Sequence, residues 1–143
     1  DVTEFLHELT EQYGRPRTIF TSPYNRAYTT AIELNKHVNS TIVCERELSE
    51  YIKSSKRPDG FGSSDLSVST IERSPIEPEN SIEKDERVDR YLNRVIPGVT
   101  WHITHGTIIK TIKKRSNTKI KVKHLTAVVL VNGTYRASYQ YLK

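Results

Sequence analysis

Two stretches of the sequence place a chemically capable side chain directly after a short β-prone run. The first, IFTSPYNRAYTTA (residues 19–31), contains Arg26, and the second, WHITHGTIIKTI (residues 101–112), contains His105. In both, a hydrophobic strand is predicted to lead into the first turn of a helix. A guanidinium and an imidazole beside the N–H groups of two helix N-termini are well suited to bind phosphate. The two stretches therefore predict a phosphoryl site.

The same pattern of strand and helix continues along the chain. Helices are predicted over residues 2–13, from Ser22-Pro23 onward, over 88–95 and behind His105. Strands are predicted at 18–21, 41–44 and 99–104, and then a hairpin in which 125–131 and 135–141 flank Asn132-Gly133. This alternation predicts an α/β fold, a three-layer sandwich with a mostly parallel sheet, helices on both faces and an antiparallel edge hairpin.

The start of the Arg26 helix is predicted at Ser22 and Pro23, because serine is a favourable N-cap and proline a favourable first helical residue. Carboxyl ends of parallel strands lie at one edge of a sheet, where open α/β folds bind ligands. Arg26 and His105 are therefore expected side by side, close enough to hold one tetrahedral anion. Side chains on opposite faces would exclude the phosphoryl site.

Composition places the chain among ordinary globular domains. Its 143 residues, 35% of them hydrophobic, fit a single domain over 1–143, and no apolar run reaches the length of a membrane span. The single cysteine, Cys44, is expected in a buried strand, where it forms no internal disulfide. A reducing, cytoplasmic location is predicted from this.

Residues 54–82 differ in composition from the rest of the chain. They contain eight serines, three prolines and two glycines, with few large hydrophobic residues. This composition predicts a long loop or insertion, and a loop of that length in a compact domain is usually functional or disordered. The stretch is therefore predicted to be a flexible lid or insertion within the domain.

A basic run follows the His105 helix and raises the net charge to +5. Seven lysines and arginines fall between Lys110 and Lys123 without an intervening acid. Such a run could face nucleic acid or another polyanion, or it could be a solvated helix end and strand face. No aromatic residues interleave with the charges, so a nucleic-acid partner is not predicted.

Four segments together resemble the histidine phosphatase (phosphoglycerate mutase-like) superfamily. TSPYNRAYTTA is similar to its SPLxRAxxTA signature, and ITHGTII to its second histidine motif. RELSEY resembles the L-x-E element that supplies an acid, and ENSIEKDERVDRYL the ES…R helix before the final strand. Their order and spacing agree over nearly the whole chain.

The resemblance implies a role for each matching residue. Arg26 would bind the phosphate, and His105 would be the second catalytic histidine. Glu50 would protonate the leaving-group oxygen and later activate water, although a solvated glutamate is an equally open reading in this acidic stretch. Gly106 would let the backbone approach the phosphate. His102 is expected to be a packing residue.

No metal and no cofactor are implied, and the five histidines show no metal-ligand spacing. His124, at the start of the predicted hairpin, is assigned no role.

The superfamily's defining Arg-His-Gly tripeptide, at the end of its first strand, is absent from the chain. With the other motifs intact, we expect that this strand and its nucleophilic histidine come from a missing upstream segment. The predicted function is hydrolysis of phosphomonoesters through a phosphohistidine, with a phosphorylated small molecule or phosphoprotein as substrate. This chain alone is predicted to be inactive. Two alternatives stay open: an inactive pseudophosphatase that binds a phosphorylated ligand or a protein partner, and a structural module of a larger protein.

Overall fold

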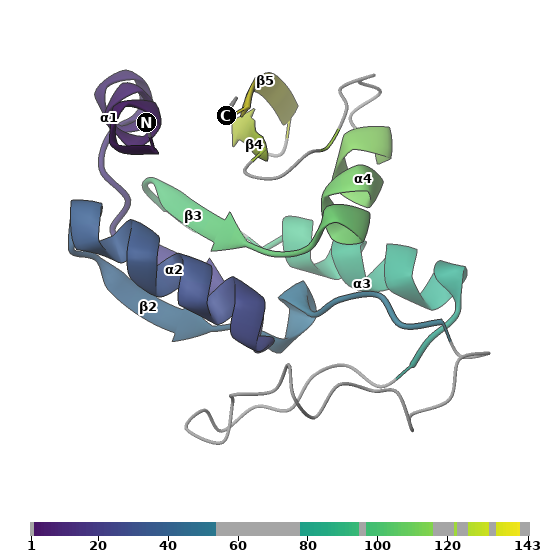
Figure 1. Cartoon of the computed structure of the whole chain (residues 1–143). Helices are drawn as coiled ribbons and strands as arrows, with labels where there is room; N and C mark the ends of the chain where they lie inside the picture. Colours follow the sequence, from purple (N-terminus) through teal and green to yellow (C-terminus); the bar gives the residue numbers. More distant parts are fainter. Residues whose placement is uncertain are drawn as a thin grey trace.

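A computed structural model describes residues 2–53, 78–94, 97–115, 122, 126–131 and 134–140. Along the chain the elements are α1 (Val2–Tyr13), β1 (Thr18–Thr21), α2 (Asn25–Val38), β2 (Thr41–Cys44), the 3₁₀ turn η1 (Arg46–Leu48), α3 (Ser81–Leu92), β3 (Thr100–Ile103), α4 (Gly106–Arg115), β4 (Thr126–Val131) and β5 (Thr134–Gln140). The fold is α/β, as predicted (Figure 1).

A parallel sheet of three strands in the order β2-β1-β3 lies at the centre. The register aligns Thr21, the last residue of β1, with Cys44 of β2 and Ile103 of β3. All three strands therefore end at one edge of the sheet, and this part of the prediction is confirmed. Cys44 lies in a strand as expected, but it is only half-buried.

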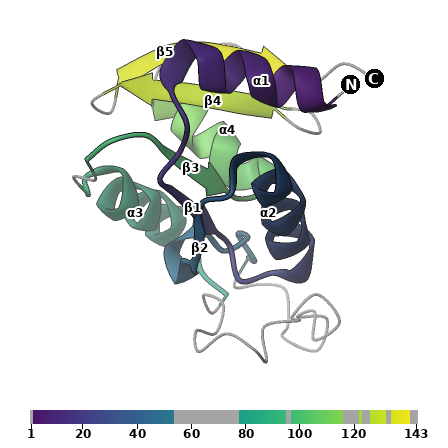
Figure 2. The same cartoon turned by 90° about the vertical axis from the view of Figure 1, so that its left-hand side faces the viewer.

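The predicted hairpin forms, but its expected place in the fold was wrong. β4 and β5 pair antiparallel with each other and make a two-stranded sheet of their own. Both views show this sheet beyond β3, on the side away from β2 (Figures 1 and 2). In the part of the chain that the structure describes, β3 hydrogen-bonds to β1 and to no second strand. The hairpin is therefore not an edge of the parallel sheet.

Helices cover both faces of the parallel sheet, so the three layers are confirmed (Figure 2). On one face, Ile19 of β1 is fully buried against Ala31 and Val38 of α2. The other face carries Phe20, which stacks on His102 of β3, and Tyr91 of α3 meets that histidine edge-on. Within the described residues, no helix combines the length and the apolarity needed to cross a membrane.

The predicted start of the Arg26 helix was wrong. α2 begins at Asn25, and Tyr24, in an extended conformation, is its N-cap. Ser22 lies three residues before α2, so it does not cap the helix; its hydroxyl accepts a hydrogen bond from the Tyr24 N–H, ahead of the helix, and lies 2.7 Å from a ring nitrogen of His105. The side chain that local propensity favoured as a cap makes a tertiary contact with His105.

The lid predicted at 54–82 is too long at its C-terminal end, since residues 81 and 82 belong to α3. Asn80 and Glu83 form a reciprocal capping box that starts this helix. Residues 54–77 lie outside the described residues. The two ends of the segment are adjacent, because the Glu79 N–H donates to the Ile52 carbonyl at 2.9 Å.

His102 is a packing residue between the rings of Phe20 and Tyr91, in agreement with its predicted role. The Tyr91 hydroxyl lies 2.5 Å from its Nδ1, and the Thr100 hydroxyl lies 2.8 Å from its Nε2. The residue as a whole is nevertheless exposed. Partial desolvation of the ring by these neighbours, together with the positive charge of Arg94, lowers the pKa of His102 from 6.5 to about 4.

A depressed histidine pKa makes folding weaker in acid. As the pH falls from 6.5 towards 4, the unfolded chain protonates His102 before the folded chain does, so this part of the stability is lost in that window. We expect His102→Phe to flatten the dependence of the urea midpoint on pH over this range. His37→Gln, which changes an exposed histidine of α2, should keep the wild-type slope. Equal slopes for His102→Phe and wild type would contradict the assignment.

Candidate functional site

The two chemically interesting strand-to-helix corners lie next to each other. β1 leads into α2 and β3 leads into α4, and the two strands are parallel neighbours. The Ser22 N–H donates to the Ile103 carbonyl at 2.9 Å, which joins one corner to the other directly. The N-termini of α2 and α4 therefore lie at the carboxyl edge of the sheet, where the sequence placed them.

Arg26, Glu50 and His105 come together at this edge. One carboxylate oxygen of Glu50, Oε2, lies 3.4 Å from Nη2 of Arg26 and 3.7 Å from Nδ1 of His105. Arg26 is half exposed, Glu50 is one-fifth exposed and His105 is buried, with exposed side-chain fractions of 50%, 20% and 4%. The guanidinium and the imidazole thus approach the same anionic oxygen, one from the rim of the site and one from its base.

Tyr24 contacts both the His105 imidazole and the Arg26 guanidinium. Its ring meets the His105 imidazole edge-on, with 5.1 Å between the ring centroids. The Arg26 guanidinium carbon lies 5.4 Å from the centroid of the same buried ring. This residue stands where the SPLxRAxxTA signature has leucine, and sequence reasoning gave it no role.

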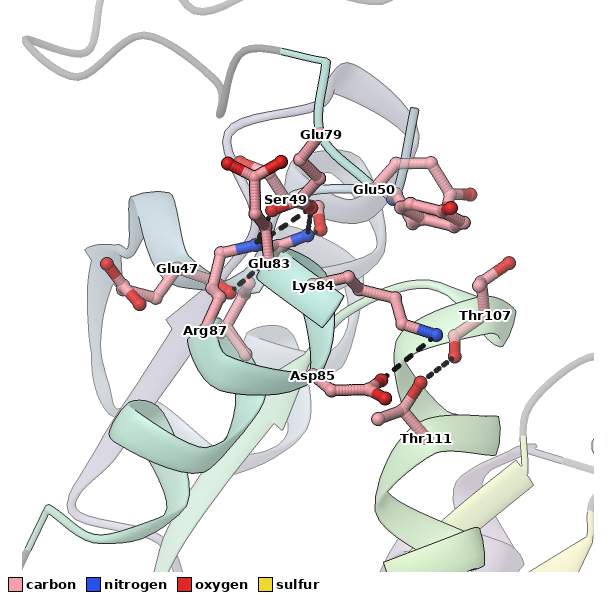
Figure 3. A network of polar contacts seen from close by, with 12 residues as sticks. Glu47, Ser49, Glu50, Glu79, Glu83, Lys84, Asp85, Arg87, Thr107 and Thr111 are labelled. Atoms are coloured by element: carbon pink, nitrogen blue, oxygen red, sulfur yellow. Dashed lines mark hydrogen bonds and ion pairs between the residues drawn. The ribbon is translucent and has the colours of Figure 1, made fainter. Parts of the chain in front are cut away.

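The backbone before Glu50 is held by Arg87, whose importance the sequence did not reveal. Arg87 is 1% exposed, and its Nη1 donates to the carbonyls of Glu47 at 2.7 Å and Ser49 at 2.9 Å. Its Nε donates to Glu79 at 3.1 Å, and its Nη2 pairs with the same carboxylate. Figure 3 shows the guanidinium between Glu79 and the segment that leads to Glu50. Arg87 lies in the stretch that resembles the ES…R helix, which was the available signal.

A second bond ties the Glu50 segment to the His105 corner. The Thr104 hydroxyl, next to His105, donates to the Leu48 carbonyl at 2.6 Å. Leu48 itself is buried at the end of η1. Acid and imidazole are therefore carried by backbone segments that are fixed to each other.

Gly106 opens α4 beside His105, and a β-carbon added there would meet no atom within 4 Å. Gly106→Ala should therefore leave the urea midpoint unchanged or slightly higher, since alanine favours a helix by up to about 1 kcal/mol. If phosphate lies against this backbone, the added methyl should raise the dissociation constant of inorganic phosphate about tenfold, by overpacking. Calorimetric titration of the wild-type chain and of Gly106→Ala with inorganic phosphate measures the two dissociation constants. Unchanged affinity would place the anion elsewhere.

Other candidate groups do not join the site. Among the described residues, no cluster of three or more histidine, cysteine, aspartate or glutamate side chains could hold a metal ion. His124 lies outside the described residues. Within the basic run, Arg115 pairs with Asp89 of α3, while 116–121 and 123 also lie outside them.

Comparisons with protein-family models, with curated proteins and with solved structures each found no match for this chain. The interpretation of the site therefore depends on the geometry of Arg26, Glu50 and His105 themselves.

Proposed function

We propose that this chain is part of a phosphomonoester hydrolase of the histidine phosphatase type, with a phosphoglycerate mutase-like fold. The observation on which the proposal depends is the shared Glu50 oxygen, which Arg26 and His105 approach at the carboxyl edge of two adjacent parallel strands. A cation and an imidazole that converge on one anionic oxygen are arranged as a phosphoryl group requires.

In this proposal a strand from a further segment adds to β3 and brings the nucleophilic imidazole. Two observations support that placement: β3 pairs on one side only within the described residues, and the β4–β5 sheet lies beyond that open side. The incoming imidazole attacks phosphorus and forms a phosphohistidine, while Arg26 and His105 bind the phosphoryl oxygens. Glu50 donates a proton to the departing alcohol oxygen and later takes one from the attacking water.

Activity towards p-nitrophenyl phosphate, measured for a polypeptide extended upstream to include an Arg-His-Gly strand, tests this proposal. We expect turnover by the extended polypeptide and none by the chain alone. An extended polypeptide without turnover would contradict the hydrolase.

A second candidate is a binding protein without catalysis. One observation favours it. Both ring nitrogens of His102 face hydroxyl groups of Tyr91 and Thr100, so that histidine is not available as a second imidazole. Titration with phosphate or vanadate separates binding from no binding, and the p-nitrophenyl phosphate assay then separates the enzyme, which turns over, from the binder, which does not. The ligand in both cases is a phosphorylated small molecule or phosphoprotein. A cytoplasmic location also remains part of the proposal.

A further inference from the structure

Ser22 is fixed between β1 and the His105 corner. Its side chain is fully buried, and its backbone N–H donates to Ile103 of β3. The hydroxyl oxygen accepts from the Tyr24 N–H at 3.2 Å and lies 2.7 Å from Nε2 of His105. These two groups are the hydrogen-bonding partners of the hydroxyl among the residues that the structure describes.

The position of the hydroxyl proton follows from this pair of partners. A serine hydroxyl has one proton to donate and two lone pairs to accept with. The Tyr24 N–H can only donate, so it uses one lone pair. The acceptor within reach of the proton is then Nε2 of His105, and any other direction would leave a buried donor unmatched.

An imidazole that accepts at Nε2 carries its single neutral-state proton on Nδ1. Nδ1 of His105 is the nitrogen that faces Glu50, at 3.7 Å, and Arg26 approaches the same carboxylate oxygen. We infer that Ser22 is a positioning residue that holds neutral His105 as its Nδ1–H tautomer, so that the ring presents a donor to an anion at this site. This inference rests on the proposed function only for the identity of that anion.

A different reading takes Ser22 as the nucleophile of a Ser-His-Glu triad, since Ser22, His105 and Glu50 are connected in that order. Burial argues against it. A nucleophile must reach its substrate, whereas Ser22 is 0% exposed and its oxygen already accepts from Tyr24. The triad is therefore an alternative outcome of the experiment.

Nitrogen NMR of the ¹⁵N-labelled full chain reads the tautomer directly. At a pH where the same spectra show a neutral ring, we expect a pyridine-type signal for Nε2 and a pyrrole-type signal for Nδ1 of His105. Ser22→Ala should lower the population of the Nδ1–H form only in part, because the Glu50 carboxylate still faces Nδ1, and Ser22→Thr, which keeps the hydroxyl, should restore the wild-type pattern. Backbone amide spectra check that each variant is folded.

A pyrrole-type Nε2 in the wild-type chain would overturn the inference, even if every variant failed to fold. Covalent labelling of Ser22 by a fluorophosphonate would also overturn it, in favour of the triad. Loss of phosphatase activity in the assay above, with the Nδ1–H tautomer intact, would count against the hydrolase and leave the tautomer standing.

Discussion

His105→Ala should lower kcat/KM for p-nitrophenyl phosphate by about two to three orders of magnitude in the upstream-extended polypeptide, as expected for loss of one positioned transition-state donor. The imidazole is the most deeply buried of the three converging groups, so water replaces its hydrogen bond poorly. Phosphate affinity should fall as well, because the same donor contacts the ground-state anion.

His105→Gln separates chemistry from folding in this experiment. A glutamine amide reaches roughly where Nε2 lies and can keep the contact with Ser22, but it offers nothing at the position of Nδ1. We therefore expect His105→Gln to be folded and as inactive as His105→Ala. His37→Ala, at an exposed site on α2, is the matched control and should retain wild-type kinetics. Full activity in both His105 variants would refute the proposed function.

The short strands could be predicted residue by residue from the sequence. β1 and β2 are β-prone runs between turn residues, and the structure places both at the predicted bounds, 18–21 and 41–44. α1 likewise spans the predicted 2–13, with Leu6 and Leu9 buried at helical spacing. In these elements local propensity and tertiary packing favour the same conformation.

Several predictions failed at positions whose partners are distant in the sequence. Ser22 and Pro23 form a good helix start by propensity, but α2 begins at Asn25, and the Ser22 hydroxyl contacts His105, 83 residues away in the sequence. The pairing of β4 with β5 was local and predictable, whereas its separation from β3 depends on long-range strand order. The start of α3 could have been predicted, because Asn80 followed by Glu83 is a capping-box pattern. It was missed because it directly follows a serine-rich stretch.

The site was predictable in its residue types but not in its support. Arg26, Glu50 and His105 were singled out from sequence, and the structure brings all three to one edge. Arg87 was not, because arginine is expected at the surface and its burial depends on partners in two other segments, Glu79 and residues 47–49. Supporting residues of this kind have few sequence signals, since their partners are backbone carbonyls that any residue type supplies.

Arg87→Met should destabilise the fold by about 3–5 kcal/mol, which is the usual cost of breaking a buried ion pair from one side. The substitution leaves the Glu79 carboxylate buried without its guanidinium and takes the donor away from the Glu47 and Ser49 carbonyls. Because those carbonyls precede Glu50, phosphate affinity should also fall wherever the variant is still folded. Urea unfolding measures the stability, and calorimetric titration measures the affinity.

Arg90→Met is the matched control for this experiment, one turn along the same helix. Arg90 is 63% exposed and pairs with Glu47 at 3.6 Å, so its loss should cost no more than about 1 kcal/mol. Arg87→Met combined with Glu79→Leu should recover part of the stability, because the double variant buries no unpaired charge. Recovery should be incomplete, since the two carbonyls still lack the donor. An Arg87→Met chain as stable as Arg90→Met would show that the buried pair does not hold the Glu50 segment in place.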